Sequence, residues 1–202
     1  MRREDIRLTS DCTISVISDN IRIDSFSCGD RELDEYFKER SVRYTSELLS
    51  KNYAFVTDSG EIVTAFSYSN YCINSQQLPG NVRNRLQRKI PNLKRMRSYP
   101  ALLIGRLGVD VRYHGLGLGS QTLNFIMRLY LYPDRDGLCR FVIVEAVNRP
   151  ETIRFYERNG FNLLYSSERE EQSSLNTRTG GALRTRMMYC DLKLWRDRQN
   201  IQ

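Results

Sequence analysis

The chain has 202 residues, of which 40% are hydrophobic and 27% are charged, and its net charge is +7. This balance is typical of a globular protein and excludes a disordered chain. Apolar runs such as FVIV are too short to cross a bilayer, and the polar N-terminus lacks the apolar core of a secretory signal. Five scattered cysteines, never spaced as CxxC, indicate a cytoplasmic protein with reduced thiols, and we predict neither a metal site nor membrane association.

The first fifty residues predict a strand region and then helix. Residues 13–18 and 21–26 alternate between apolar and polar side chains, which is typical of strands. Apolar residues then recur at helical intervals from Leu33 to Leu48. Asp30, just before this stretch, is a candidate N-cap.

A hairpin and a basic insertion follow. Residues 52–58 and 61–69 predict two strands joined by a tight turn, in which Gly60 supplies the positive φ. Residues 76–99 predict an insertion that contains a short helix ended by Pro91. Within it, RNRLQRKIPNLKRMR has seven basic residues and no acidic one: Arg83, Arg85, Arg88, Lys89, Lys94, Arg95 and Arg97. Such a patch indicates a polyanionic partner or a phosphorylated ligand, and a solvated helical face is the structural alternative.

A central strand and a glycine-rich turn come next. Residues 101–110 form the strongest candidate for a buried strand. RYHGLGLGS, at 112–120, follows directly, and apolar residues at helical spacing predict a helix that begins near Gly119.

The C-terminal part alternates strand and helix. Residues 140–147 predict a buried strand, and residues 150–160 a helix with proline in its first turn and glycine at its end. Residues 161–167 and 186–195 predict the last two strands, with a polar loop at 167–184 between them. The order of elements predicts an α/β fold with a mixed sheet, in one domain over 1–202.

Three classes of phosphate-binding turn compete for the glycine motif. A P-loop needs a lysine after its glycines, and none follows here. A dinucleotide fingerprint needs a third glycine where this chain has Ser120. The pattern Arg-x-x-Gly-x-Gly fits Arg112, Gly115 and Gly117.

This last pattern resembles motif A of the GNAT N-acetyltransferase superfamily, whose members use acetyl-CoA. LGVDVRYHGLGLG is similar to the family's strand, loop and helix, and VEAVNRPETIRFYERNGF is similar to its second motif. The resemblance implies a GNAT-like α/β fold, in which a mixed, mostly antiparallel sheet splays at the cofactor site and is flanked by helices.

The resemblance also implies which residues bind acetyl-CoA. Amides of the turn would hold the pyrophosphate, because they point at the ligand with the helix dipole behind them. A Cβ at Gly115 or Gly117 would crowd that approach. Main-chain groups of the preceding strand would bind pantetheine. The implied cofactor-binding residues are Leu107, Val109, Arg112, Tyr113, His114, Gly115, Gly117, Gly119, Ser120 and Asn148.

The chemistry implied is attack by a neutral amine on the thioester, followed by protonation of the leaving thiolate. Tyr156 in FYERNGF matches the family's tyrosine general acid, with a core aromatic residue as the alternative. Asn148 would contact the cofactor or cap a turn. Glu145 is a candidate base, against an ion pair or an outward-facing carboxylate. His114, the only histidine, lies in the turn, where we expect it to point outward rather than act as a base.

The N-terminal FSCGDRELDEYFKERS is similar to the start of bacterial GNAT toxins that acetylate aminoacyl-tRNA. This resemblance implies an acetyl-CoA-dependent N-acetyltransferase acting on charged tRNA, an antitoxin partner and a homodimer, with the basic insertion contacting phosphates. Acetylation of small amines or of protein amino groups stays open, as does a GNAT-like protein that binds acyl-CoA or nucleic acid without turnover.

Overall fold

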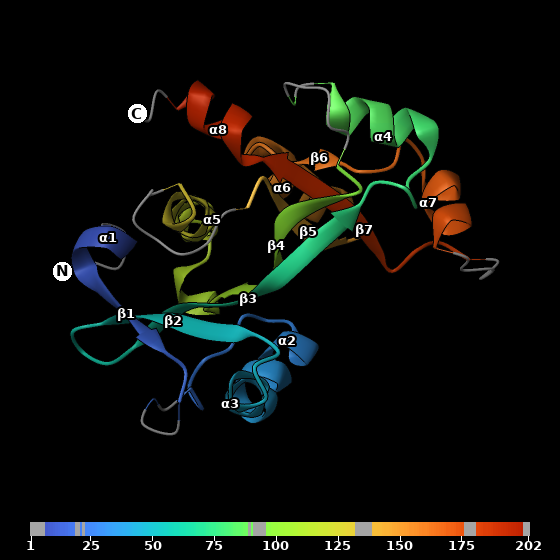
Figure 1. Ribbon diagram of the computed structural model, residues 1–202. Helices are drawn as coiled ribbons and strands as arrows, with labels where there is room; N and C mark the ends of the chain where they lie inside the picture. Colours follow the sequence, from blue (N-terminus) through green and yellow to red (C-terminus); the bar gives the residue numbers. More distant parts are fainter. Residues whose placement is uncertain are drawn as a thin grey trace. The chain divides into compact units, whose positions relative to one another are not determined.

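The computed structural model describes residues 7–18, 21, 23–88, 90, 96–131, 139–175 and 181–199. The chain forms a first unit from Met1–Ser69 and Ile104–Leu129, and a second unit from Asn70–Leu103 and Tyr130–Gln202. Neither unit is a continuous segment, because the chain passes between them within strands β3 (Ile62–Asn74) and β4 (Ser98–Val109). Each unit combines strands with helices (Figure 1).

The strands of the first unit follow the order β1-β2-β3-β4. β1 (Cys12–Val16) pairs antiparallel with β2 (Lys51–Thr57), and β2 pairs antiparallel with β3. Gly60 lies between β2 and β3 at φ +81°, which confirms the predicted hairpin turn. A short helix, α1 (Leu8–Asp11), precedes β1.

The predicted helical stretch after residue 30 is present in three consecutive pieces. They are α2 (Arg31–Glu35), a π-helical turn η2 (Tyr36–Arg40) and α3 (Ser41–Ser46). Asp30 is the N-cap, since its carboxylate accepts the amides two and three residues further on at 3.0 and 3.1 Å. The stretch contributes Phe37, which is fully buried, to the core of the first unit.

The helix after the glycine turn, α5 (Leu118–Leu129), begins one residue before the predicted start. It is amphipathic, and one side is buried in the first unit through Leu118, Thr122, Leu123, Ile126 and Met127. Burial of this side fixes where the preceding turn meets the sheet.

The strands of the second unit follow the order β3-β4-β5-β7-β6. β5 (Phe141–Val147) pairs antiparallel with β7 (Thr185–Asp191), and the short β6 (Asn162–Leu163) pairs antiparallel with the other side of β7. The helices are α4 (Gly80–Gln87), α6 (Pro150–Arg158), α7 (Glu168–Ser174) and α8 (Leu192–Arg198). The hydrophobic core of the second unit includes Val82, Leu86, Tyr99, Phe141, Ile143, Leu164 and Tyr165.

Three predictions for the second unit need correction. The strand predicted over 186–195 ends at Asp191, whose carboxylate accepts the Leu194 amide at 3.2 Å and caps α8 instead. The strand predicted over 161–167 is ordered as a strand only at Asn162–Leu163. The segment predicted as a polar loop at 167–184 contains α7, whose N-cap is Ser167.

The predicted α/β class, with a mixed sheet flanked by helices, is confirmed, whereas a single domain over 1–202 stays a prediction. Within the described ranges, none of the helices has the length and apolarity that crossing a bilayer requires.

Candidate active site

A tight turn in the first unit joins the end of β4 to the start of α5 and carries the glycine motif. One 3-10 turn, η3 (Val111–Tyr113), leads to Gly115 and Gly117, which have φ angles of +81° and +72°. These are left-handed conformations that a residue with a Cβ adopts only with strain. Apart from each glycine and its two chain neighbours, no described atom lies within 4 Å of the position that a Cβ would take. The main chain is therefore open to a ligand on that side of the turn.

Asp110 organises the start of this turn. Its side chain is only 1% exposed, and it accepts hydrogen bonds from the Ser27 amide at 3.2 Å and the Arg112 amide at 3.0 Å. The Arg112 guanidinium adds two more, from Nε at 2.8 Å and Nη2 at 3.1 Å. Burial alone would raise the pKa of Asp110, but the hydrogen bonds from Arg112 and Ser27 outweigh burial and hold that pKa below its usual value.

Each nitrogen of the Arg112 guanidinium donates a hydrogen bond inside the first unit. Besides its bonds to Asp110, the guanidinium donates from Nη1 to Glu61 Oε1 at 2.7 Å. Glu61 also accepts the Tyr113 hydroxyl at 3.0 Å. These contacts favour a role for Arg112 and Tyr113 in holding the turn, rather than side-chain contact with a pyrophosphate.

The amides at the start of the turn also have acceptors within the chain. Arg112 N–H donates to the Asp110 carboxylate, Tyr113 N–H to the Asp110 carbonyl at 2.8 Å, and His114 N–H to the Val111 carbonyl at 3.4 Å. The exposed ring of His114 bonds through Nε2 to the Val109 carbonyl at 2.8 Å. The amides best placed for an anion are therefore those that follow, from Gly115 to Ser120.

Tyr156 lies on α6 of the second unit, half-buried between two aromatic rings. Its ring centroid is 5.1 Å from that of Phe155 and 5.4 Å from that of Phe161, in edge-to-face geometry. Burial raises the pKa of Tyr156 to about 12. The phenol therefore keeps its proton at neutral pH, as a general acid must.

Asn148 follows β5 and holds together three parts of the second unit. Its Nδ2 donates to the Leu183 carbonyl at 2.9 Å and to Glu168 Oε2 at 3.3 Å, and its amide donates to the Arg184 carbonyl at 2.9 Å. These bonds favour the turn-capping alternative, and cofactor contact by Asn148 stays a prediction.

Glu145 is exposed on β5, opposite Met187 of β7. Burial raises the pKa of Tyr71, and the negative charge of Glu145 raises it further. This position leaves the carboxylate accessible to solvent, and a role as base stays a prediction. In the described part of the chain, no three His, Cys, Asp or Glu side chains are grouped to hold a metal ion.

The basic insertion divides into residues with different surroundings. The Arg85 guanidinium bonds to the Leu163 carbonyl at 3.2 Å, to the Leu164 carbonyl and to Ser166 Oγ at 3.4 Å, so it anchors α4 next to β6. Arg88 and Arg97 are exposed, and Arg83 is half-buried. The remaining predicted contacts, Lys89, Lys94 and Arg95, lie outside the described residues.

Comparison with known proteins identifies the family. No protein-family model matches the chain. A tRNA-acetylating toxin of Mycobacterium tuberculosis is 31% identical over 149 residues, which are 73% of this chain and 82% of the relative. The chain belongs to the tRNA-acetylating toxin family. A probable toxin TacT of Sinorhizobium fredii is 27% identical over 149 residues, 70% of this chain and 78% of the relative. The predicted GNAT membership and the enzyme class, N-acetyltransferase, are thereby confirmed.

Several solved structures of toxins share the fold of this chain. A KacT variant, in which a tyrosine is replaced by phenylalanine, has a TM-score of 0.70 at 23% identity and covers 93% of this chain and 99% of its own. AtaT complexed with acetyl-methionyl-tRNAfMet has a TM-score of 0.68 at 20% identity, over 94% of this chain and 99% of its own. AtaTR bound with AcCoA has a TM-score of 0.63 at 19% identity, over 91% and 95%.

Sequence analysis missed the carboxylates that hold the turn in this member of the tRNA-acetylating toxin family. For Asp110 a signal existed, because a strand that ends in Asp before a turn often uses that side chain to cap the next amides. For Glu61 there was none, since it lies 51 residues before its partner Arg112.

Proposed function

We propose that this protein transfers the acetyl group of acetyl-CoA to the α-amino group of an aminoacyl-tRNA. The observation that carries this proposal is the 31% identity to a tRNA-acetylating toxin over 82% of that relative. The open turn at Gly115 and Gly117 supports it, since it has the form of an anion-binding strand-to-helix turn. Neighbours of the same fold are described with acetyl-CoA and with acetyl-methionyl-tRNAfMet, which supports both substrates.

In this proposal the pyrophosphate of CoA binds the amides from Gly115 to Ser120, at the N-terminus of α5. The three preceding amides are used within the chain, so Arg112, Tyr113 and His114 shape the turn. Main-chain groups of Leu107 hold pantetheine. Val109 would bind pantetheine through its amide, because its carbonyl is already bonded to the His114 ring.

The reaction follows from the groups that each substrate brings. The neutral amine attacks the thioester carbonyl, the tetrahedral intermediate expels the CoA thiolate, and Tyr156 supplies the proton that the thiolate takes up. An α-amino group has a pKa of about 8, so a useful fraction is neutral at physiological pH without a strong base. The proton that the amine loses then passes to water, or to Glu145.

The test is a comparison of acceptors with acetyl-labelled acetyl-CoA. We expect label on charged tRNA, and none on uncharged tRNA, polyamines or peptides, with one free CoA released for each acetyl group transferred. Tyr156→Phe is the matched control for turnover. Labelling of peptides or polyamines at a rate equal to that of charged tRNA would refute the acceptor, and CoA binding without turnover would refute the enzyme.

An antitoxin partner, a homodimer and a cytoplasmic location also belong to this proposal. Neighbouring structures are described as AtaT bound to the C-terminus of the antitoxin AtaR and as a KacTA–DNA complex, which supports a partner of that kind. Charged tRNA is a cytoplasmic substrate, so the proposed reaction requires that location.

A further inference from the structure

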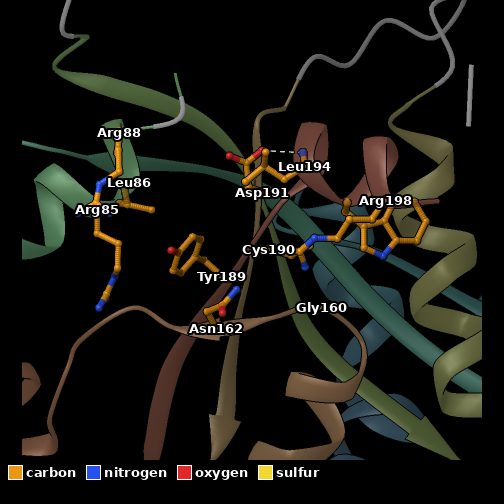
Figure 2. Close-up of a pocket in the computed structure, with 11 residues that line it drawn as sticks. Arg85, Leu86, Arg88, Gly160, Asn162, Tyr189, Cys190, Asp191, Leu194 and Arg198 are labelled. Carbon is orange, nitrogen blue, oxygen red and sulfur yellow. Dashed lines mark hydrogen bonds between the residues drawn. The ribbon is translucent and has the colours of Figure 1, made fainter. Parts of the chain in front are cut away.

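The second unit contains a pocket of about 170 Å³ that neither the glycine motif nor Tyr156 lines. It lies among α4, β6, β7 and α8, and the chain reaches it at Gly160, four residues after Tyr156 (Figure 2). The lining residues used below are Arg85, Arg88, Gly160, Tyr189, Trp195 and Arg198.

The pocket is cationic. Arg85 of α4 and Arg88, the residue that follows α4, reach it from one side, and Arg198 of α8 reaches it from the opposite side (Figure 2). Asp191 is the only acidic residue among the described ones that line it, and its Oδ2 accepts a hydrogen bond from Arg140 at 2.8 Å. The Arg85 guanidinium is bonded to neutral carbonyls, but after the hydrogen bonds from Asn81 and Ser166 its charge also lowers the pKa of Glu170. Part of the Arg85 charge is thus offset, and Arg88 and Arg198 supply most of the positive charge. An anion entering here therefore meets a net positive charge.

The same pocket offers aromatic surface. Tyr189 is half-buried and is held by an edge-to-face contact with Phe141, at 6.1 Å between ring centroids. Trp195 is 5% exposed and lies against Gly160, where a Cβ would come within 3.1 Å of its Cδ1. Both rings are thus fixed before any ligand arrives. Burial raises the pKa of the Cys190 thiol, which also lines the pocket, to about 12, so this thiol is not a nucleophile at neutral pH.

Arginines beside fixed aromatic rings are the combination that recognises nucleotides, with the guanidinium on the phosphate and the ring on the base. The size limits the ligand further. Pockets for drug-sized molecules measure about 300–1,000 Å³, so this one takes only a fragment, such as one phosphate with its sugar or one base. A base-paired helix offers this pocket only a phosphate and a sugar, whereas an unpaired nucleotide can also lay its base against an aromatic ring.

We propose that this pocket binds one unpaired nucleotide of the acceptor tRNA, with its phosphate between Arg88 and Arg198 and its base or ribose against Tyr189. The proposal rests on the proposed function and gives it a recognition site outside the acetyl-transfer chemistry. It also changes the role of the basic insertion, because Arg85 shapes the pocket through main-chain bonds while Arg88 makes the phosphate contact.

The only tryptophan of the chain provides a local probe of this pocket. We expect uncharged tRNA to change Trp195 emission, and the double variant Arg88→Ala/Arg198→Ala to need at least about tenfold more tRNA for the same change. A matched control is Arg154→Ala/Arg169→Ala, which removes the same charge from exposed positions of α6 and α7. Unaltered emission on saturation with tRNA would overturn the proposal.

The salt dependence of tRNA binding shows how many phosphates the protein neutralises. The logarithm of the tRNA association constant falls with the logarithm of salt concentration by about 0.7 for each neutralised phosphate of a single strand. The Arg88→Ala/Arg198→Ala variant should lower this slope by about 0.7, and the control variant should leave it unchanged. An equal loss of slope in both variants would contradict a defined site and indicate only general attraction.

Two further measurements separate this inference from the proposed function and from a free-nucleotide site. With charged tRNA and acetyl-CoA, the Arg88→Ala/Arg198→Ala variant should raise the KM for tRNA about tenfold and leave kcat and the KM for acetyl-CoA unchanged. If the native protein acetylates charged tRNA and the variant has a native KM, the inference fails while the proposed function stands. AMP or CMP should bind far more weakly than tRNA, and inorganic phosphate should not change Trp195 emission. A mononucleotide that binds as tightly as tRNA would overturn the proposal in favour of a site for a free nucleotide.

Discussion

Asp110 is the residue whose loss tests the turn most sharply. Its buried carboxylate accepts four hydrogen bonds, three of them from Arg112, within 3.2 Å. Removing one partner of a buried ion pair costs about 3–5 kcal/mol, but the Arg112 side chain is 30% exposed and keeps its bond to Glu61. For Asp110→Asn we therefore expect a loss of about 2–4 kcal/mol in the free energy of unfolding.

The pH dependence of this effect has a defined sign. Because the pKa of Asp110 is lowered in the folded protein, its charge stabilises the fold above the unfolded pKa of about 3.9 and ceases to do so as pH falls through the folded value. The difference between the native protein and Asp110→Asn should thus be full at pH 7 and shrink below about pH 4.

Urea denaturation at pH 7, 5, 4 and 3 measures this difference directly. Glu61→Gln is the matched control, since Glu61 is 34% exposed in its ion pair with Arg112, and it should cost only about 0–1 kcal/mol. A loss below about 1 kcal/mol for Asp110→Asn, or a loss equal at pH 7 and pH 3, would refute the reasoning that Asp110 fixes the turn through its charge.

Three further changes follow from the same geometry. Tyr156→Phe should lower kcat by about 10²–10⁴-fold and leave the acetyl-CoA Kd unchanged in calorimetry, and near-native turnover would assign Tyr156 to the core. Gly115→Ala should lower the free energy of unfolding by only about 1–2 kcal/mol, since no other described side chain or backbone lies near the added Cβ. The same Cβ should weaken acetyl-CoA binding, because it would crowd the approach of the pyrophosphate to the turn, and unchanged binding would show that the pyrophosphate does not bind there. Gly160→Ala places a Cβ 3.1 Å from Trp195 at φ +89°, so the Tm should fall and Trp195 emission should shift; native emission would show that the ring is not held by this contact.

Local signals in the sequence predicted the elements that depend on local chemistry. The cap at Asp30, the hairpin turn at Gly60 and the helix from Pro150 to its end before Gly160 are all in place. In each case one residue type satisfies a backbone requirement within a few positions, so no distant partner is needed.

Elements that depend on distant partners could not be predicted in this way. The segment with α7 is polar and has no apolar stripe, but Glu171 is 1% exposed and accepts Arg186 Nε and the Met187 amide, both at 2.6 Å. The end of β7 was missed because the alternation of apolar and polar residues continues from Cys190 to Leu194, whereas Trp195 is buried as part of a helix. The basic insertion predicts Arg85 as a phosphate contact, whereas the bonds of its guanidinium to carbonyls 78 and 79 residues away depend on the fold.

The same division between local and distant interactions applies to the candidate site. The positive φ angles at Gly115 and Gly117 follow from the motif itself. The engagement of Arg112 with Asp110 and Glu61 does not, because an arginine in a phosphate-binding motif suggests a ligand contact and only the three-dimensional structure places two carboxylates around it.

The central claim is acetyl transfer to the amino group of a charged tRNA. The most direct measurement is mass spectrometry of the 3′-terminal aminoacyl-adenosine, released by nuclease after incubation of charged tRNA with acetyl-CoA and the protein. We predict a product heavier by one acetyl group, carried on the α-amino nitrogen, and formed at least about 100-fold more slowly by Tyr156→Phe at the same protein concentration. An unmodified aminoacyl-adenosine in the presence of bound acetyl-CoA would contradict the claim.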